Sequence, residues 1–336
     1  MYALISQGHT YLFQEEEKIM KKITGFIIIL MVIAVGLFAA GAKDYPSRNI
    51  NILVGYPAGG NTDLATRALA DAAAPYLPKG VTFVVSNVVG DAGLIAFNQF
   101  ANSRPDGYTL ICANIDMAIN YAIKRTEYGM DDWIPTGAAF YDPYGLVVSG
   151  NNPNYSDFKE FIDYVKANPG KVTIGHSGLG STPNILADMF EKHFGVSVRQ
   201  VPYNGTPDAV VAIVNGEIDA HFCQATPALS HIRAGTVRLV TMMTDQRNPL
   251  WPDVPTAKEI SPNFDNKFIA WGFISAPKGT PPEVISFLRD AFDKAMPTPE
   301  FAKNMANLNQ AVPPIDSRNM VQFVKEQYDL YQSILR

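Results

Sequence analysis

The chain has 336 residues, of which 47% are apolar and 18% charged, a composition typical of a globular protein long enough for two domains with buried cores. This composition excludes a disordered or fibrous protein. The net charge is −5 and no cluster or stripe of basic residues stands out, which argues against nucleic acid as a partner.

The N-terminal segment has the pattern of a secretory signal peptide. Met20-Lys21-Lys22 precedes an uncharged run over residues 23–42, and Ala40-Gly41-Ala42 supplies the small residues that a signal peptidase recognises. We therefore expect a periplasmic protein, cleaved after about Ala42. Residues 1–19 fit no targeting signal, so Met20 is the expected start. The alternative is an uncleaved anchor, because about 20 residues can span a bilayer.

Beyond this leader, strand-like apolar runs alternate with helical runs. The expected strands are Ile50–Tyr56, Val81–Ser86, Tyr108–Cys112, Gly145–Ser149, Val172–Gly175, Val198–Pro202, Ile218–Cys223, Val237–Met242 and Phe268–Ser275. The expected helices are Thr62–Ala74, Asp157–Ala167, Pro183–Phe194, Pro207–Asn215, Pro282–Ala295 and Arg318–Ile334. The alternation predicts an α/β fold with mostly parallel sheets, in which ligands bind beyond the carboxyl ends of the strands.

Two segments share a pattern in which a short strand runs into a glycine-rich turn and then a helix. They cover residues 50–73 and 171–194. A helix N-terminus offers free backbone N–H groups and a positive dipole end, and glycines let an anion approach them. Two such turns, a domain's length apart, predict two jaws that close on a small anion.

The first turn, residues 55–62, is one residue short of a phosphate-binding P-loop, because Asn61 stands where the lysine should be. The cradle then suits a smaller anion such as a carboxylate. Asn61 or Thr62 could cap the helix that follows. Asp63 and Arg67 stand four residues apart, and an ion pair along the helix explains them better than a ligand site.

The second turn begins as Gly175-His176-Ser177-Gly178, like the elbow of a serine hydrolase, but Leu179 replaces the second glycine. Ser177, Ser181 and Thr182 fit better as hydroxyl donors around a second anion cradle, and either of the latter two could also cap the helix. A secreted hydrolase that uses Ser177 stays an alternative.

A third turn gives weaker candidates. Tyr203 and Asn204 follow another strand and could contact a ligand or simply form a turn, and Gln224 follows the strand that ends at Cys223. Cys112 and Cys223 fall in different expected domains, so we expect two buried free thiols rather than a disulfide. The sequence has no paired carboxylates, metal-spaced ligands or redox motif, so we expect a binding site without cofactor, metal or catalysis.

Taken in order, these motifs resemble the receptors of tripartite tricarboxylate transporters, the extracytoplasmic Bug proteins. The resemblance spans nearly the whole chain after the leader. It is carried by Tyr45-Pro-Ser-Arg48, Pro57–Asp63 with Arg67, Asn87–Gly93, Arg104–Leu110, Gly178–Thr182, Val201–Gly205, Ile232–Arg238, Pro252–Thr256 with Glu259, and Ala276–Pro281.

The resemblance implies a type II periplasmic-binding-protein fold, a two-domain clamshell hinged by crossing strands. Residues 43–143 and 268–336 would form domain I and residues 144–267 domain II. It further implies a monomer that captures a small carboxylate between the two loops and delivers it to permease subunits. The ligand-binding residues carried over by position are Pro57, Ala58, Gly59, Gly60, Thr62, Asp63, Ser177, Gly178, Gly180, Ser181 and Thr182.

Three departures from the family pattern bear on the ligand. Asn184 stands where the family usually has histidine, Asn87–Gly93 differs from the usual Asn-Arg-Pro-Gly-Ala-Gly-Gly, and Asp91 adds a negative charge there. Neither loop holds Lys or Arg, so one or two carboxylates fit better than three, and a dicarboxylate or aromatic acid is expected before citrate. A binding protein that serves a sensor instead of a permease stays open. We expect valine at Gly60 or Gly180 to abolish binding.

Overall fold

The computed structural model describes residues 45–264, 269–316 and 319–335. Residues 45–47 belong to a separate N-terminal unit, and the unit described below begins at Arg48. The expected signal peptide, its cleavage site after Ala42 and the start at Met20 all lie outside the described residues. Among the described helices, none has both the length and the apolar character that crossing a membrane requires.

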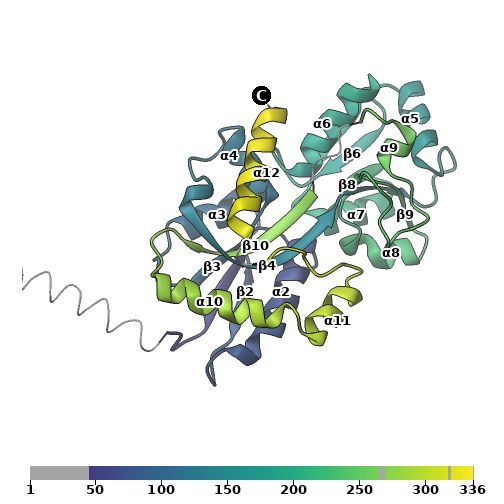
Figure 1. Cartoon of the computed structure of the whole chain (residues 1–336). Coiled ribbons are helices and arrows are strands. Elements are labelled where there is room, and N and C mark those ends of the chain that lie inside the picture. The colour runs from purple at the N-terminus through teal and green to yellow at the C-terminus, as the bar shows by residue number, and fades with distance from the viewer. Residues whose placement is uncertain (1–44, 265–268, 317–318, 336) are drawn as a thin grey trace, which may run out of the picture. The chain divides into compact units, whose positions relative to one another are not determined.

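The strands form two five-stranded sheets, each the centre of one lobe (Figure 1). Lobe I is built on the sheet β2-β1-β3-β10-β4, and lobe II on the sheet β7-β6-β8-β5-β9. The lobe I strands are β1 (Ile50–Val54), β2 (Phe83–Asn87), β3 (Thr109–Asn114), β4 (Trp133–Pro143) and β10 (Ile269–Pro277). The lobe II strands are β5 (Gly145–Ser149), β6 (Thr173–His176), β7 (Arg199–Pro202), β8 (Ala220–Cys223) and β9 (Val237–Met242).

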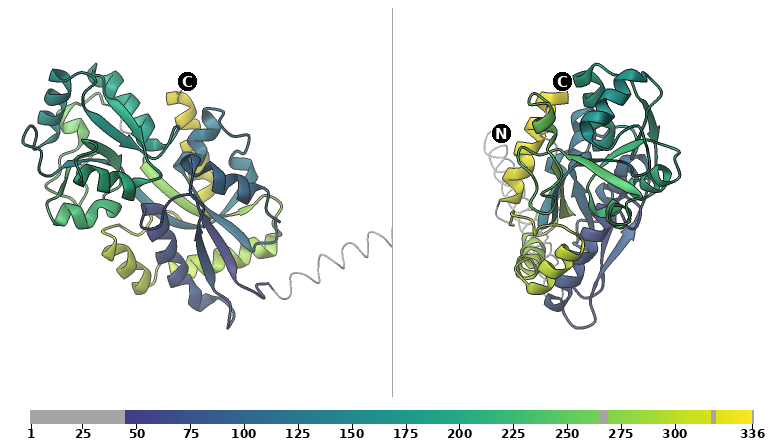
Figure 2. Two further views of the ribbon diagram at one scale, coloured as in Figure 1. Left: turned by 180° about the vertical axis from the view of Figure 1, so that it is seen from behind. Right: turned by 90° about the vertical axis from the view of Figure 1, so that its right-hand side faces the viewer.

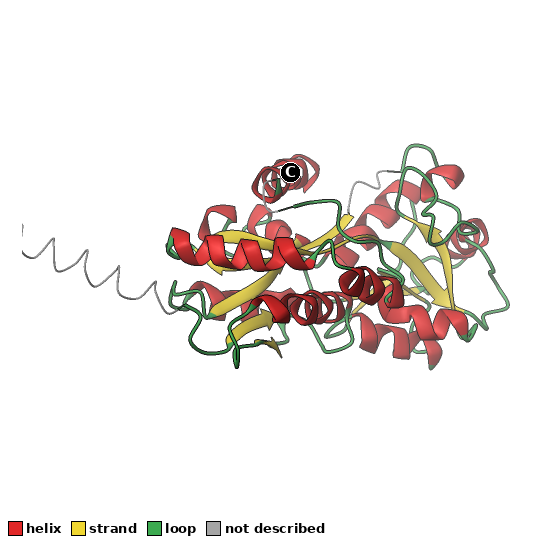
Figure 3. Ribbon diagram, turned by 60° about the horizontal axis from the view of Figure 1, so that its bottom comes forward, coloured by secondary structure: helices red, strands yellow, loops and turns green. Residues whose placement is uncertain are grey.

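Helices cover both faces of each sheet (Figure 3). In lobe I these are α2 (Asn61–Ala73), α3 (Leu94–Ala101), α4 (Ile115–Ala122), α10 (Pro282–Ala295), α11 (Pro299–Asn307) and α12 (Met320–Leu335). In lobe II they are α5 (Phe158–Ala167), α6 (Thr182–Phe194), α7 (Thr206–Val214), α8 (Leu229–Arg233) and α9 (Ala257–Ile260). Short 3-10 turns add η1 (Ala74–Tyr76), η2 (Asp91–Gly93), η3 (Met130–Asp132) and η4 (Thr226–Ala228). Prolines fall in the first turns of α6, α7 and α10, as expected.

The expectation of mostly parallel sheets is wrong. Strand β1 pairs parallel with β2 and β3, and β6 pairs parallel with β7 and β8. The other strands, β4 and β10 in lobe I and β5 and β9 in lobe II, join their sheets by antiparallel pairing. Strand β4 was not expected at all, and it leads through Tyr144 directly into β5 of the other lobe. Strand β4 crosses into the other lobe as β5 with no helix between them, so these two strands do not form the helix-linked crossover that parallel pairing requires.

The lobes draw on different parts of the chain. Lobe I takes its strands from residues 50–143 and 269–277, whereas lobe II takes its strands from residues 145–242. The colours of Figure 2 show this, with both ends of the colour range in one lobe and the teal middle in the other. This allocation of strands supports the proposed division into domains, whose boundaries stay a prediction.

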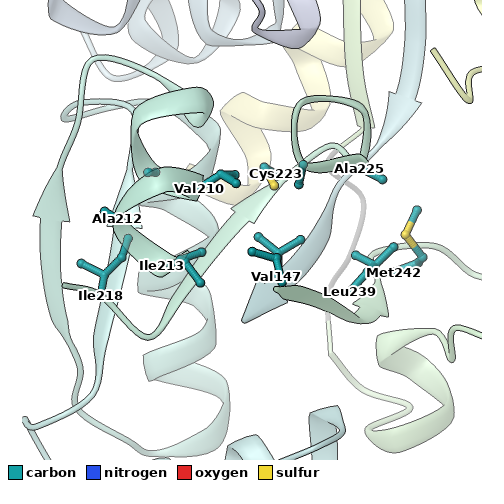
Figure 4. Packing of buried hydrophobic residues seen from close by; sticks show 12 residues of the cluster. Val147, Val210, Ala212, Ile213, Ile218, Cys223, Ala225, Leu239 and Met242 are labelled. Carbon is teal, nitrogen blue, oxygen red and sulfur yellow. The ribbon is translucent and has the colours of Figure 1, made fainter. Parts of the chain in front are cut away.

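Lobe II has a compact apolar core between α7 and its sheet (Figure 4). Val147 of β5 lies between Val210 and Ile213 of α7 on one side and Leu239 of β9 on the other, and each is at most 6% exposed. Cys223 belongs to the same cluster and Cys112 is buried in lobe I, and both are free thiols, as expected. Val201 of β7 and Tyr203 of the third turn pack against this cluster.

Candidate functional site

A cavity of about 40 Å³ lies between the lobes, where the carboxyl ends of β1, β3 and β6 meet the first turns of four helices. The residues that line it are Tyr56, Pro57, Gly60, Asn61, Thr62, Asn114, Ile115, Asp116, Phe140, Tyr144, Ser177, Pro183, Thr206, Pro207, Gln224 and Ala270. Both glycine-rich turns therefore reach one cavity. Five of the fourteen candidate residues line it, namely Pro57, Gly60, Thr62, Ser177 and Gln224.

The first turn presents an uncapped helix N-terminus to this cavity. Helix α2 begins at Asn61 after the N-cap residue Gly60, and no side-chain hydrogen bond caps it. Ala58 and Gly59 are exposed and stand outside the lining. An uncapped first turn carries partial positive charge without a formal cation, which suits a carboxylate.

Asp63, in the same helix, shapes the turn instead of facing the cavity. Its Oδ2 accepts from the Gly59 N–H at 2.9 Å, and its Oδ1 accepts from Arg67 Nε and from Asn87 Nδ2, each at 2.9 Å. Burial raises the pKa of this carboxyl, but hydrogen bonds from Arg67, Gly59 and Asn87 outweigh burial and lower it. The ion pair with Arg67 confirms the expectation for these two residues.

In the second turn, the backbone N–H groups of two glycines donate to side chains of the protein itself. The Gly178 N–H donates to His176 Nδ1 at 3.1 Å, and the Gly180 N–H donates to Asn184 Oδ1 at 3.0 Å. Ser181 Oγ donates to the Gly178 carbonyl at 2.7 Å. Gly178, Gly180, Ser181 and Thr182 do not line the cavity, so this turn reaches it through Ser177 alone.

A carboxylate from the other lobe occupies the N-terminus of α6. Asp116 Oδ1 accepts from the Thr182 N–H at 2.8 Å and from Thr182 Oγ1 at 2.6 Å. Asp116 Oδ2 accepts from the Tyr56 hydroxyl at 2.5 Å. The side chain is 4% exposed, and burial raises its pKa against these hydrogen bonds. A carboxyl group of α4 thus lies where the second cradle was expected.

The third turn mainly supports lobe II. Tyr203 packs against the apolar cluster of Figure 4 and donates its N–H to the His176 carbonyl, while Asn204 is exposed, and neither lines the cavity. Behind the turn, His221 Nδ1 must donate to the Gly175 carbonyl at 2.7 Å, because a carbonyl only accepts. Its Nε2 then accepts from Thr206 Oγ1 at 3.2 Å. Burial lowers the pKa of His221 to about 4, so the ring is neutral.

Asn61 and the α4 residues Ile115 and Asp116 line the cavity without having been candidates. Asn61 had been considered only as a helix cap. Asn114 and Asp116 follow the carboxyl end of an expected strand, as the chosen residues do, and that position was the available signal. No glycine marks that turn, which is why it was passed over.

Ser177 lacks the partner that a nucleophile needs. Over the described ranges, no hydrogen bond joins it to a histidine, and the adjacent His176 ring accepts from Gly178 instead. The same ranges hold no group of three His, Cys, Asp or Glu side chains that could bind a metal ion.

The chain is similar to known proteins in sequence and in fold. The model of the tripartite tricarboxylate transporter family receptor matches residues 65–336. BugT of Bordetella pertussis is 31% identical over 282 residues, covering 80% of this chain and 84% of BugT.

Two solved structures are also similar. A protein described as a periplasmic transporter is 31% identical with a TM-score of 0.79, covering 87% of this chain and 97% of its own. MatC from Rhodopseudomonas palustris with bound malate is 27% identical with a TM-score of 0.80, covering 87% of this chain and 100% of MatC.

Proposed function

The chain belongs to the receptor family of tripartite tricarboxylate transporters, and we propose that it captures one small carboxylate between its lobes and delivers it to the permease subunits of such a transporter. The family consists of solute-binding receptors, so the alternative of a serine hydrolase is wrong. The observation that carries the proposal is the cavity lined by both lobes at the uncapped N-terminus of α2.

Hydrogen-bond donors around α2 support a carboxylate as the ligand. Gly60, Asn61 and Thr62 of the first turn line the cavity, and helix N-termini bind anions without a charged side chain. The structure of MatC, which holds malate, is that of a relative with the same fold, and it makes small organic acids the first ligands to test.

Capture requires the lobes to separate. A cavity of about 40 Å³ has room for only about three water molecules, less than a four-carbon acid needs. Around it the lobes touch directly, with Asn120 Nδ2 donating to the Gly180 carbonyl at 3.3 Å and Arg125 donating to the Leu179 carbonyl. We infer that strands β4 and β10 serve as the hinge, and that a ligand contacting both lobes favours the closed state.

Export and delivery complete the proposed role. The family's periplasmic receptors act outside the cytoplasm, and residues 23–42 have the pattern of a signal peptide with cleavage after Ala42. We propose a monomer that works without cofactor or metal and docks on its permease in the loaded state. A deletion strain that loses uptake of the bound acid supports transport, whereas normal uptake with a lost transcriptional response supports a sensor.

A thermal-shift screen of the purified protein against mono-, di- and tricarboxylates tests the proposal. A ligand at about a hundred times its dissociation constant adds about 2.7 kcal/mol to the free energy of unfolding, which raises the melting temperature visibly. At least one carboxylate should do so. A folded protein that responds to no carboxylate would contradict the proposed ligand class.

A further inference from the structure

The end of the cavity at the first turn of α2 differs in hydrogen-bonding character from the end at Asp116. Hydrogen bonds that run from Leu308 through Thr226 and Gln310 to Asn61 determine the character of the α2 end, which we call the first end. The Leu308 carbonyl can only accept, so Thr226 Oγ1 donates to it at 2.9 Å. Thr226 has no second hydrogen, so Gln310 Nε2 must donate to Thr226 Oγ1 at 2.8 Å. The same Nε2 donates to Asn61 Oδ1 at 2.5 Å, which fixes the orientation of the Asn61 amide.

Asn61 therefore has an NH2 group to offer a ligand. Its side chain is 5% exposed and lines the cavity, and within the described part of the chain its Nδ2 has no acceptor. A buried donor without a partner is costly, so a ligand acceptor at this point gains the full hydrogen bond. Together with the uncapped first turn of α2, this makes the first end of the cavity a donor site for one carboxylate.

The second end of the cavity is formed by the carboxyl group of Asp116. Asp116 lines the same cavity, and every described contact of its carboxylate comes from a donor group of Thr182 or Tyr56. The Tyr56 hydroxyl has one hydrogen and also lies 3.1 Å from the Ala92 carbonyl, and the shorter contact of 2.5 Å assigns that hydrogen to Asp116 Oδ2. The N–H and the hydroxyl of Thr182 both donate to Oδ1, and this set of donors suits the ionised form, which accepts only. The N-terminus of α6 is thereby used to stabilise this internal anion and is not free for a second carboxylate of the ligand.

Among the described residues, no Lys or Arg forms an ion pair with Asp116. The residues that line the cavity include neither Lys nor Arg. Two arginines that contact residues at the turns are paired, Arg67 with Asp63 at 2.9 Å and Arg125 with Asp91 at 2.5 Å. A second ligand carboxylate near Asp116 would therefore meet a like charge in a desolvated site, which is strongly unfavourable.

We propose that Asp116 makes the receptor selective for acids with a single carboxylate, bound at α2, whose opposite end is uncharged or cationic. This inference rests on the proposed function, since it narrows the ligand class of the same cavity. It assigns to Asp116 the rejection of dicarboxylates and to Asn61 the recognition of the carboxylate that is accepted.

Matched ligand series test the inference by isothermal titration calorimetry. Each series contains a diacid, its monoamide and an amino acid of similar length: succinate, succinamate and 4-aminobutanoate; adipate, adipamate and 6-aminohexanoate; terephthalate, 4-carbamoylbenzoate and 4-(aminomethyl)benzoate. In any series that binds, the monoamide or the amino acid should bind at least tenfold more tightly than the diacid. A diacid that binds as tightly as its two partners overturns the inference and leaves the proposed function standing. If no compound of any series binds to the folded protein, both the inference and the proposed function are overturned.

Asp116→Asn provides the second test, because asparagine keeps the shape and can still accept from Thr182. In this variant, the ratio of the dissociation constant of the diacid to that of its monoamide should fall at least fivefold. Asp71→Asn is the matched control, since Asp71 is an exposed residue of α2, and it should keep the ratio of the parent protein. If a folded Asp116→Asn variant keeps this ratio unchanged, the role of Asp116 is overturned. The ratio measured on the parent protein decides the ligand class whether or not the variant folds.

Discussion

The two glycine-rich turns are alike in sequence but differ in what lies at the helix that follows. Helix α2 begins without a side-chain cap, and the Nδ2 of its first residue, Asn61, has no acceptor in the described ranges. Helix α6 begins with the Thr182 N–H donating to Asp116 of the other lobe. The same local pattern thus gives an open anion site in one case and a contact between lobes in the other. A helix N-terminus attracts an anion, and the surrounding fold decides whether the protein or the ligand supplies it.

The groups that support the two turns also differ. Asp63, an ionised carboxylate, holds the first turn through the Gly59 N–H. His221, a neutral imidazole, holds the strand before the second turn through the Gly175 carbonyl. Acidification should therefore weaken the two supports in different pH ranges, so each turn can be examined separately.

The largest effect is expected at Gly180, where the turn meets the other lobe. Gly180 has φ +77°, and a Cβ there would lie 2.8 Å from Asn120 Oδ1. Gly180→Val should hold the lobes apart and weaken binding of the best ligand by at least about 100-fold, or about 2.7 kcal/mol, as measured by calorimetry. Gly195→Val is the control, because Gly195 has φ +63° with no atom within 4 Å of a Cβ, so it shares the backbone strain alone. Equal affinities in the two variants would show that this contact is not needed for closure.

Gly60→Val tests the open turn. Gly60 has an ordinary φ of −72° and lines the cavity, so valine there should obstruct the carboxylate site. Its Cβ would also lie 3.1 Å from the Pro57 carbonyl oxygen, which must shift slightly. We expect binding to fall by at least about 30-fold, about 2 kcal/mol, with a small decrease in melting temperature. Calorimetry and thermal unfolding measure the two quantities, and normal affinity would exclude the first turn as the ligand site.

The support of the second turn should fail in mild acid. Burial lowers the pKa of His221 to about 4, below the ordinary value of 6.5, so between these values the unfolded chain binds more protons than the folded one. The contribution of His221 is complete above pH 6.5 and is lost as the pH falls toward 4. By this effect, the free energy of unfolding should drop by about 2 kcal/mol between pH 7 and pH 5, measured in urea. His221→Gln should flatten this slope and His231→Gln should not, and equal slopes in both variants would refute the assignment.

The support of the first turn should fail only at lower pH. The pKa of Asp63 is lowered, so its stabilisation is complete above the unfolded value of about 3.9 and is lost as the pH falls through the folded value. Asp63→Asn should cost about 1.5 kcal/mol at pH 7, through the loss of charge-assisted hydrogen bonds. Urea unfolding at pH 5 and pH 3 should show a smaller acid loss in this variant than in Asp71→Asn. The same acid loss in both variants would assign it to other carboxyls.

The smallest effect is expected from Gln310, which orients Asn61 without lining the cavity. Gln310→Met removes the two donated hydrogen bonds, so the Asn61 amide is free to rotate. Affinity for the carboxylate should fall about fivefold, about 1 kcal/mol. Gln322→Met, at an exposed position of α12, is the control and should leave the dissociation constant unchanged. If Gln310→Met binds as tightly as this control, Asn61 is oriented by other contacts.

Much of the fold could be predicted from local pattern. The bounds of β5, β9 and α10 are as expected, and so is the ion pair between Asp63 and Arg67. Strand β4 was missed because Pro135 and Gly137 interrupt its apolar run. Helices α3 and α4 were also missed, each only eight residues long and too short for a clear helical period.

The sequence by itself determined the family, the α/β class and the two turns that meet at the cavity. It could do so because a strand, a glycine turn and a helix start each depend on residues that are adjacent in sequence. Only the tertiary structure decided which turn stays open. Asp116 and Thr182 are 66 residues apart, and Asn61 and Gln310 are 249 apart. Local pattern describes what a segment's own backbone can do, whereas hydrogen-bond partners brought together by folding determine which of its donors are left for a ligand.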